Sequence, residues 1–253
     1  MSSHRPCALI PVYNHGRTVA AVARGLRAQG LPCILVDDGS EPDCAAVLDA
    51  LAREPGMHLV RRPVNGGKGM AMLDGFRAAD RLGYSHVLQI DADGQHAVQD
   101  VERFLALSRA HPEALIGGAP VYGADAPLVR LYGRWLTRVW VWINTLSLDI
   151  PDPMCGFRLY PLPPTLAVIE HAQVGRRMDY DIGIIVRLHW RGMPMIWVPT
   201  RVAYPADGVS HFRALRDNVL ISLMHARLFF GMLWRAPWLL ARRVLKAVRR
   251  TRA

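Results

Sequence analysis

The sequence has 253 residues, of which 51% are apolar and 21% are charged, and its formal net charge is +10. A chain of this length buries roughly 70 to 75% of its unfolded surface. It therefore needs no disulfides to fold, and its apolar content excludes disordered and collagen-like classes. Residues 213–253 carry +9 of the charge and residues 1–212 only +1. Any argument from charge to a partner therefore concerns the tail.

The cysteines and the first residues indicate a cytosolic catalytic part. The four cysteines form no CxxC pair and no zinc-type spacing with a histidine, which predicts reduced thiols. The first apolar run ends at Tyr13 and Asn14. It is too short for the apolar core of a signal peptide, and we expect it to form a first strand.

Short apolar runs alternate with amphipathic segments through the first half of the chain. The runs end in polar or glycine residues, as strands buried on both faces of a parallel sheet do. We expect strands over residues 7–13, 33–39, 58–63, 86–93 and 114–120. We expect helices between them, over residues 17–29, 43–53, 67–82 and 97–109. This alternation predicts an α/β fold with a Rossmann-like, mostly parallel sheet flanked by helices.

The alternation stops after residue 120. We expect a helix over 127–146, a loop over 149–164, a helix over 181–190 and a strand over 194–199. No repeat and no flexible linker interrupts the chain. We therefore expect one catalytic domain over residues 1–211 and a basic, amphipathic segment over residues 212–253, divided by the shift in charge.

Polar side chains follow the second and fourth expected strands, where ligands bind in parallel sheets. Asp37 and Asp38 follow one strand, and Asp91, Asp93 and Gln95 follow the other. Carboxylates gathered in this way repel one another unless a cation or hydrogen-bond donors compensate them. Oxygen ligands favour Mg²⁺ or Mn²⁺. The alternative is that either aspartate pair only caps the next helix.

The segment NGGKG, residues 65–69, opens the third expected helix and could bind an anion there. It is not a Walker motif, because Arg62 replaces the first glycine and Gly69 stands where Ser or Thr should follow the lysine. No GxGxxG follows the first strand either. Nucleotide hydrolysis and nicotinamide binding therefore lose their main support.

The motifs PVYN, VDDGS, NGGKG, DADGQH and MCGFRLY occur in this order within residues 6–205. The chain thereby resembles the family 2 glycosyltransferases with the GT-A fold, especially the branch of dolichyl-phosphate mannose synthases and polyprenyl-phosphate sugar transferases. The resemblance implies a nucleotide-sugar donor, Mg²⁺ or Mn²⁺ held by Asp91, Asp93 and Gln95, and inversion at the anomeric centre. The donor-binding residues that we predict are Pro11, Tyr13, Asn14, Asp37, Asp38, Gly67, Lys68, Asp91 and His211.

The acceptor can be a lipid phosphate or a hydroxylated lipid. A phosphate monoester is already ionised at neutral pH and needs no strong base, and Arg130, Arg134 or Arg158 could bind it. A hydroxyl acceptor needs a carboxylate base. Besides Asp93, the catalytic candidates are Asp152, Asp179 and Asp181.

Two departures from the polyprenyl-phosphate branch bear on the acceptor. Residues 118–122 read GAPVY where many members have GSRY, so an arginine is missing, and Gly183 stands where many have a glutamate. CGFRLYP, RMDYD and YPADGVSHF are closer to bacterial relatives encoded beside lipid acyltransferases. A hydroxylated lipid acceptor therefore stays open.

The tail contains a largely apolar stretch, residues 219–241, with Arg227 and Arg235 inside it. Each central arginine costs about 2.5 to 3.5 kcal/mol in a membrane span. Asn218, Ser222 and His225 form a polar stripe at helical spacing. We therefore expect a helix lying on the cytoplasmic face of the membrane against anionic headgroups, with Trp234 and Trp238 as anchors. A structural or oligomer-forming helix and a true span are the alternatives.

Two other functions remain as rivals. A sugar nucleotidyltransferase would share the sheet and the metal. A basic nucleic-acid-binding module would use residues 212–253, but the aromatic residues there lie in apolar clusters instead of alternating with the cations. We expect no nucleic-acid partner, and we expect Trp135, Trp140 and Trp142 to pack a helix and not to stack on a sugar. The sequence leaves the nucleotide, the sugar and the oligomeric state open.

Overall fold

A computed structural model describes residues 4–122, 128–202 and 214–251 of the chain. Its centre is one sheet of seven strands in the order β3-β2-β1-β4-β6-β5-β7. β6 is antiparallel to its two neighbours, and the other pairs are parallel. The strands are β1 (Pro6–Val12), β2 (Cys33–Asp37), β3 (Met57–Arg61), β4 (His86–Gln89), β5 (Leu115–Val121), β6 (Arg158–Pro161) and β7 (Met195–Arg201).

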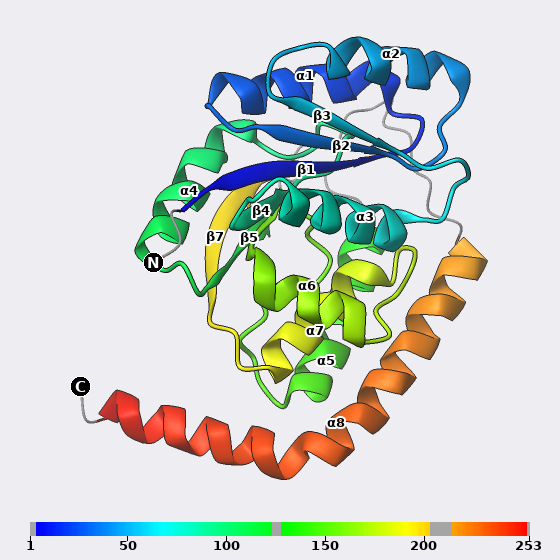
Figure 1. The fold of residues 1–253 in the computed structure, drawn as a ribbon. Helices are drawn as coiled ribbons and strands as arrows, with labels where there is room; N and C mark the ends of the chain where they lie inside the picture. Colours follow the sequence, from blue (N-terminus) through cyan, green and yellow to red (C-terminus); the bar gives the residue numbers. More distant parts are fainter. Residues whose placement is uncertain (1–3, 123–127, 203–213, 252–253) are drawn as a thin grey trace.

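Helices cover both faces of this sheet (Figure 1). The helices are α1 (Gly16–Ala28), α2 (Pro42–Ala52), α3 (Lys68–Arg81), the short 3-10 helix η1 (Val98–Asp100), α4 (Val101–Ala110), α5 (Leu128–Thr145), α6 (Leu162–His171), α7 (Tyr180–Trp190) and α8 (Ala214–Thr251). One apolar core lies between the sheet and α1, α2 and α4, and a second lies between the sheet and α3, α6 and α7. The α/β fold with a mostly parallel sheet is therefore confirmed.

The segment expected to be a loop, residues 149–164, is partly regular. It contains β6 and the start of α6. β6 has only four residues and all are buried, so its sequence shows no alternation. Pro161 is the N-cap of α6, and Pro163 and Pro164 lie in its first turn, where a proline sacrifices no helical hydrogen bond.

A third apolar core joins α5, α7 and α8, and Met224, Leu228 and Met232 of α8 contribute to it. Figure 1 shows α8 as a long arc that passes beneath α5 and α7. It is one helix of 38 residues with Pro237 inside it. The domain boundary at residue 211 remains a prediction.

Two arginines attach the end of α8 to its neighbours. Arg242 donates from Nη2 to the carbonyl of His189 at 2.8 Å, and Arg243 donates from Nη1 to the carbonyl of Leu146 at 3.0 Å. These carbonyls lie at the C-terminal ends of α7 and α5, where the helix dipole favours a cation. Part of the basic charge of the tail therefore has an internal partner.

Two expectations about the helical region were wrong. Trp135, which we expected to pack a helix, is 49% exposed on the outer face of α5, whereas Trp140, although 40% exposed, does lie against a helix, with its ring centre 5.9 Å from that of His225 in α8. His225, which we expected to join Asn218 and Ser222 in a polar stripe, is buried against Asn144 of α5. The contacts between α5 and α8 decide both outcomes, and helical periodicity alone does not reveal them.

Candidate active site

A pocket lies at the carboxyl ends of the central strands, where five separate segments meet. Its lining comes from the segment after β4, the end of β5, the inner face of α5, the loop before β6 and the residue after β7. The lining residues are Asp91, Asp93, Gln95, His96, Pro120, Tyr122, Arg134, Met154, Cys155, Gly156 and Val202. The structure thus brings all three predicted metal ligands and one predicted acceptor-binding arginine into one pocket.

The two pocket aspartates differ in their electrostatic surroundings. Asp91 forms an ion pair with Lys68, with Oδ1 and Nζ 2.7 Å apart. Burial alone would raise the pKa of Asp91, but the ammonium group of Lys68 holds this pKa below its ordinary value. Burial and the neighbouring Asp91 raise the pKa of Asp93. Among the described residues, no lysine or arginine lies within ion-pair distance of Asp93. The pocket therefore contains a half-buried carboxylate with no counter-cation among the residues that the structure describes.

The residues present fit a divalent metal. Two carboxylates and the side-chain oxygen of Gln95 line the same pocket. Within the described parts of the chain, no three Asp, Glu, His or Cys side chains converge on a metal-sized site. The candidate set is thus small and consists of oxygen ligands, which is typical of Mg²⁺ or Mn²⁺ sites that share the ion with a substrate phosphate.

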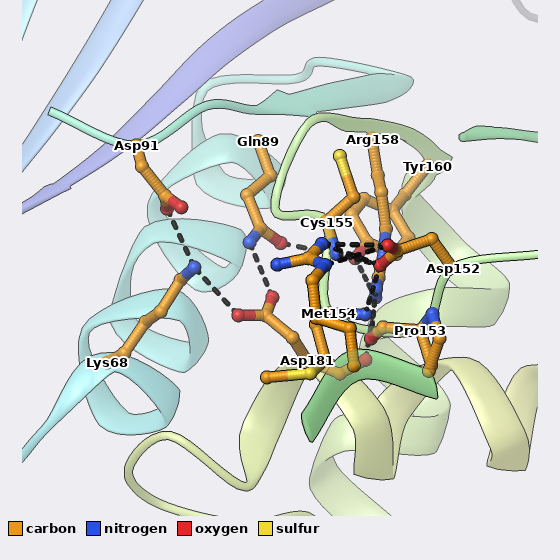
Figure 2. Close-up of polar contacts among 11 residues, drawn as sticks. Lys68, Gln89, Asp91, Asp152, Pro153, Met154, Cys155, Arg158, Tyr160 and Asp181 are labelled. Atoms are coloured by element: carbon orange, nitrogen blue, oxygen red, sulfur yellow. Dashed lines mark hydrogen bonds and ion pairs between the residues drawn. The ribbon is translucent and has the colours of Figure 1, made fainter. Parts of the chain in front are cut away.

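Lys68 joins the pocket to the start of α7. Its Nζ lies 2.7 Å from Asp91 Oδ1 and 2.7 Å from Asp181 Oδ2 (Figure 2). The second oxygen of Asp181 accepts a hydrogen bond from Gln89 Nε2 at 2.7 Å. Asp181, which we predicted as a catalytic residue, therefore uses both oxygens inside the protein and does not line the pocket.

The predicted nucleotide-side loop is fixed by Asp38. Its carboxylate accepts hydrogen bonds from the backbone N–H groups of Gly66 and Gly67 at 2.9 and 2.8 Å. Gly67 has φ of +92°, and a side chain there would collide with the carbonyl of Arg176. Asp37 accepts from Arg61 at 3.0 Å and from the N–H of Ser40. In this structure, both aspartates shape loops at the carboxyl edge of the sheet.

Arg134 and Asp152 form a bidentate ion pair beside the pocket, with Arg134 Nη2 2.8 Å from Asp152 Oδ1. Tyr122 donates to Oδ2 of the same carboxylate, and the N–H groups of Met154 and Cys155 donate to Oδ1. The hydrogen bonds from Arg134 to Asp152 come from Nε and Nη2, and none of them comes from Nη1. Both oxygens of Asp152 therefore already accept several hydrogen bonds, so this carboxylate is saturated with internal partners and is poorly suited to act as a general base.

The prediction that Arg158 binds an acceptor is wrong for this structure. Its side chain is completely buried, and its guanidinium donates to the carbonyls of Pro153 and Asp181 at 2.6 and 2.7 Å. A third bond goes to Tyr160 Oη. Arg158 thus joins the loop before β6 to α7 from inside the protein, where an acceptor cannot reach it.

The other predicted site residues either do not line the pocket or have side chains that the structure does not describe. Asp179 accepts a hydrogen bond from the N–H of Arg177 and is not a pocket-lining residue. Asn14 has φ of +57° and bonds to Ser40 and Glu41, which fixes the end of β1 beside Pro11 and Tyr13. Arg130 lies in α5, but its side chain is not among those described, and His211 falls outside the described residues.

Several residues of this site were not predicted from the sequence. Tyr122 contacts both members of the Arg134–Asp152 pair, with the Arg134 guanidinium 5.3 Å from its ring centre. Gln89 and Tyr160 belong to the network beneath Lys68. Gln89 did give a signal, because it is a polar residue within a buried apolar strand.

The fold and the site together define a glycosyltransferase with the GT-A fold. The chain belongs to glycosyl transferase family 2, since the sequence model described as Glycosyl transferase family 2 matches residues 7–162. It is 30% identical over 223 residues to polyprenol monophosphomannose synthase of Mycolicibacterium smegmatis, covering 82% of this chain and 81% of that protein. It is 27% identical over 202 residues to undecaprenyl-phosphate mannosyltransferase of Micrococcus luteus, covering 77% and 82% of the two chains.

Solved structures support the fold. Glucosyl-3-phosphoglycerate synthase from Mycobacterium tuberculosis in complex with uridine diphosphate aligns with a TM-score of 0.65 at 16% identity, covering 91% of this chain and 80% of that one. The same enzyme in complex with Mn²⁺ and uridine-diphosphate-glucose aligns with a TM-score of 0.65 at 15% identity, covering 91% and 79%. At this level of identity, the likeness establishes a shared GT-A architecture.

Proposed function

We propose that this protein transfers a sugar from a nucleotide-diphosphate sugar to a polyprenyl phosphate at the cytoplasmic face of the membrane, with Mg²⁺ or Mn²⁺ and with inversion at the anomeric carbon. One observation carries the proposal. Arg134 lines the same pocket as Asp91, Asp93 and Gln95, and it stands on a helix whose outer face is apolar. A phosphate on a membrane lipid can meet a metal-bound donor at such a point.

On the donor side, Asp91, Asp93 and Gln95 would hold the metal. When bound, the metal stabilises the charge that develops on the leaving nucleoside diphosphate. We assign Pro11, Tyr13, Asn14, Asp37, Asp38, Gly67, Lys68 and His211 to the nucleotide side, as the sequence predicted. In support, Asp38 orders the loop that begins α3, and Asn14 fixes the end of β1.

On the acceptor side, the state of the candidate bases favours a phosphate. Asp152 and Asp181 are saturated by internal partners, and neither they nor Asp179 line the pocket. A hydroxyl acceptor needs a free carboxylate near its oxygen, whereas an ionised phosphate does not. We assign the phosphate to Nη1 of Arg134, with Arg130 as a second cation on the same helix. Two relatives are named polyprenol monophosphomannose synthase and undecaprenyl-phosphate mannosyltransferase, which agrees with this choice.

The membrane side of the proposal rests on exposed apolar residues of two packed helices. On α5 they are Tyr132, Trp135, Leu136, Trp140 and Ile143, and on α8 they include Val219, Leu223, Phe230, Leu233, Trp234 and Trp238. Trp234 is 87% exposed. Such a surface is typical of a protein that lies on a bilayer, with tryptophans at the headgroup level and arginines against anionic lipids.

We propose that α8 lies on the membrane and does not cross it. The stretch Leu215–Leu245 is long and apolar enough for a span by length and composition. However, its inner face packs on α5 and α7 through Met224, Leu228 and Met232, and a spanning helix would lose these contacts. Arg227 and Arg235 add about 2.5 to 3.5 kcal/mol each to the cost of insertion near the membrane centre.

The test is a product assay with purified full-length protein. Undecaprenyl phosphate in lipid vesicles, Mn²⁺ or Mg²⁺, and a panel of uridine- and guanosine-diphosphate sugars are incubated with it, and the lipids are analysed by mass spectrometry. The proposal predicts a lipid carrying one added sugar and release of a nucleoside diphosphate. Release of pyrophosphate would indicate a nucleotidyltransferase. Metal-independent, salt-sensitive binding of nucleic acid by residues 212–253 without sugar transfer would indicate the binding module.

A further inference from the structure

The charges around the candidate metal site are distributed unequally. Asp91 has an internal cation, the ammonium group of Lys68 at 2.7 Å. Asp93 has no such partner among the described residues. A divalent ion at this site therefore shares one of its two carboxylate ligands with a lysine.

The position of Lys68 is set by a chain of buried groups. Asp181 Oδ2 binds Lys68, and Asp181 Oδ1 accepts from Gln89. Tyr160 donates to Gln89 Oε1 at 3.1 Å, and Arg158 donates to the backbone carbonyl of Asp181 at 2.7 Å. Figure 2 shows Lys68 between the two carboxylates at the edge of this network. Lys68 is therefore anchored independently of Asp91.

The backbone closes over the pair as well. A Cβ atom added at Gly156 would lie 2.6 Å from Asp91 Oδ2 and 2.9 Å from Lys68 Nζ. Only glycine at this position allows the loop before β6 to pack on the ion pair. The loop, the lysine and both aspartates thus form one unit in the wall of the pocket, and solvent screens their charges weakly.

We propose that Lys68 is a built-in counter-cation of Asp91, which weakens the binding of a divalent metal to the free enzyme so that the metal is retained mainly together with the diphosphate of the donor. This inference rests on the proposed function. The ammonium group of Lys68 repels a second cation at the same carboxylate, because it already neutralises much of the charge of Asp91. The two phosphates of the donor would then supply the negative charge that the metal needs. Lys68 acts here as a positioning residue through Asp91.

Two variants of this network should change the metal affinity in opposite directions. In Asp181→Asn, Lys68 loses one partner and its whole charge falls on Asp91, so metal binding weakens. In the double variant Lys68→Met with Asp181→Asn, the lysine and its anchoring charge are removed together, so Asp91 is free for the metal. The double variant is preferable to Lys68→Met alone, which would bury two carboxylates without compensation.

The experiment measures Mn²⁺ binding to purified full-length protein by the electron paramagnetic resonance signal of free Mn²⁺, with and without UDP or GDP. We expect the double variant to bind Mn²⁺ at least about tenfold more tightly than Asp181→Asn and more tightly than wild type. Wild type falls between them. The nucleotide should strengthen Mn²⁺ binding by a larger factor in wild type than in the double variant. Arg81→Met, which removes an exposed cation from the same helix, serves as the control and should match wild type.

Two results would overturn the inference in different ways. If the double variant remains folded by circular dichroism but binds Mn²⁺ no more tightly than Asp181→Asn, Lys68 is only structural, while the metal site itself stands. If Asp93→Asn leaves the Mn²⁺ affinity of the wild-type background unchanged, the metal assignment of the proposed function fails, and the role of Lys68 fails with it.

Discussion

Arg134 and Trp135 are neighbours in the sequence, and their side chains leave α5 in directions about 100° apart around the helix axis. Arg134 lines the pocket and pairs with Asp152 at 2.8 Å, whereas the side chain of Trp135 is 49% exposed on the outer face of the helix. One helix thus presents a pocket-lining side chain and a side chain of the exposed apolar surface from adjacent sides of the same turn. This relationship leads to the first prediction.

Replacing Trp135 by glutamate should weaken membrane binding. The variant loses one large apolar side chain that would insert into the bilayer, which lowers its partition coefficient on vesicles about tenfold. Flotation with vesicles containing phosphatidylglycerol measures this coefficient. Leu82→Glu, at an exposed apolar position after α3, introduces the same charge elsewhere and should float like wild type. Equal losses in both variants would mean that charge, and not the face of α5, controls binding.

Replacing Asp93 by asparagine should abolish transfer without destabilising the protein. Burial and Asp91 already raise the pKa of Asp93, so the carboxylate costs stability when no metal is bound. We expect transfer to fall at least about a hundredfold, and the Tm without metal to stay equal or rise. When Mn²⁺ is added in the presence of UDP or GDP, wild type should gain Tm and the variant should not. A variant that keeps its Mn²⁺-dependent gain would contradict the assignment of Asp93.

Replacing Asp152 by asparagine should lower stability. It removes the carboxylate that binds Arg134, Tyr122 and two backbone N–H groups, and the expected loss is about 2 to 3 kcal/mol in the free energy of unfolding by urea. Asp43→Asn, at an exposed position of α2, is the control. Unchanged stability in Asp152→Asn would contradict this structural role. If Asp152 were instead the catalytic base, the acidic limb of the pH–rate profile, where that base is protonated, would disappear in the variant.

Acidification should destabilise the protein through His86 at the amino end of β4. Burial lowers the pKa of His86 below its ordinary value of 6.5, and its neutral ring bonds to Ser85 Oγ and to the carbonyl of Pro112. Below that ordinary value, the unfolded chain binds the proton before the folded one does, so stability falls as the pH falls.

In His86→Gln this dependence should be shallower. Urea unfolding at several values between about pH 7 and pH 5 measures it. An equally steep fall in the variant would assign the effect to other groups.

The sequence was sufficient for the fold and for the metal-site candidates. Asp91 and Asp93 follow a buried run directly, and the carboxyl end of a parallel strand is a place that sequence pattern can locate. Lys68 was assigned to the nucleotide side, but its contact with Asp181 was not foreseen, because 113 residues separate the two. Arg158 looked like a ligand for an anion for a related reason, since one of the carbonyls that accept from it, that of Asp181, lies 23 residues further along the chain.

The tail shows the same limit. Its charge and its apolar stretch can be identified in the sequence, and they predicted a membrane-facing helix. The sequence did not show that Arg242 and Arg243 cap α7 and α5. Nor did it show that α5 adds its own tryptophans to the exposed surface, because helical periodicity identifies an apolar face and not the neighbour that covers it.

The central claim is that a phosphate oxygen of the lipid attacks the sugar and not a phosphorus atom. Undecaprenyl phosphate labelled with oxygen-18 at its terminal phosphate oxygens tests this directly in a mass-spectrometric assay with the active donor. We predict that the product lipid carries one added sugar and retains all of the label, and that the released nucleoside diphosphate carries none. A lipid with an additional phosphorus and release of a nucleoside monophosphate or pyrophosphate would contradict the account.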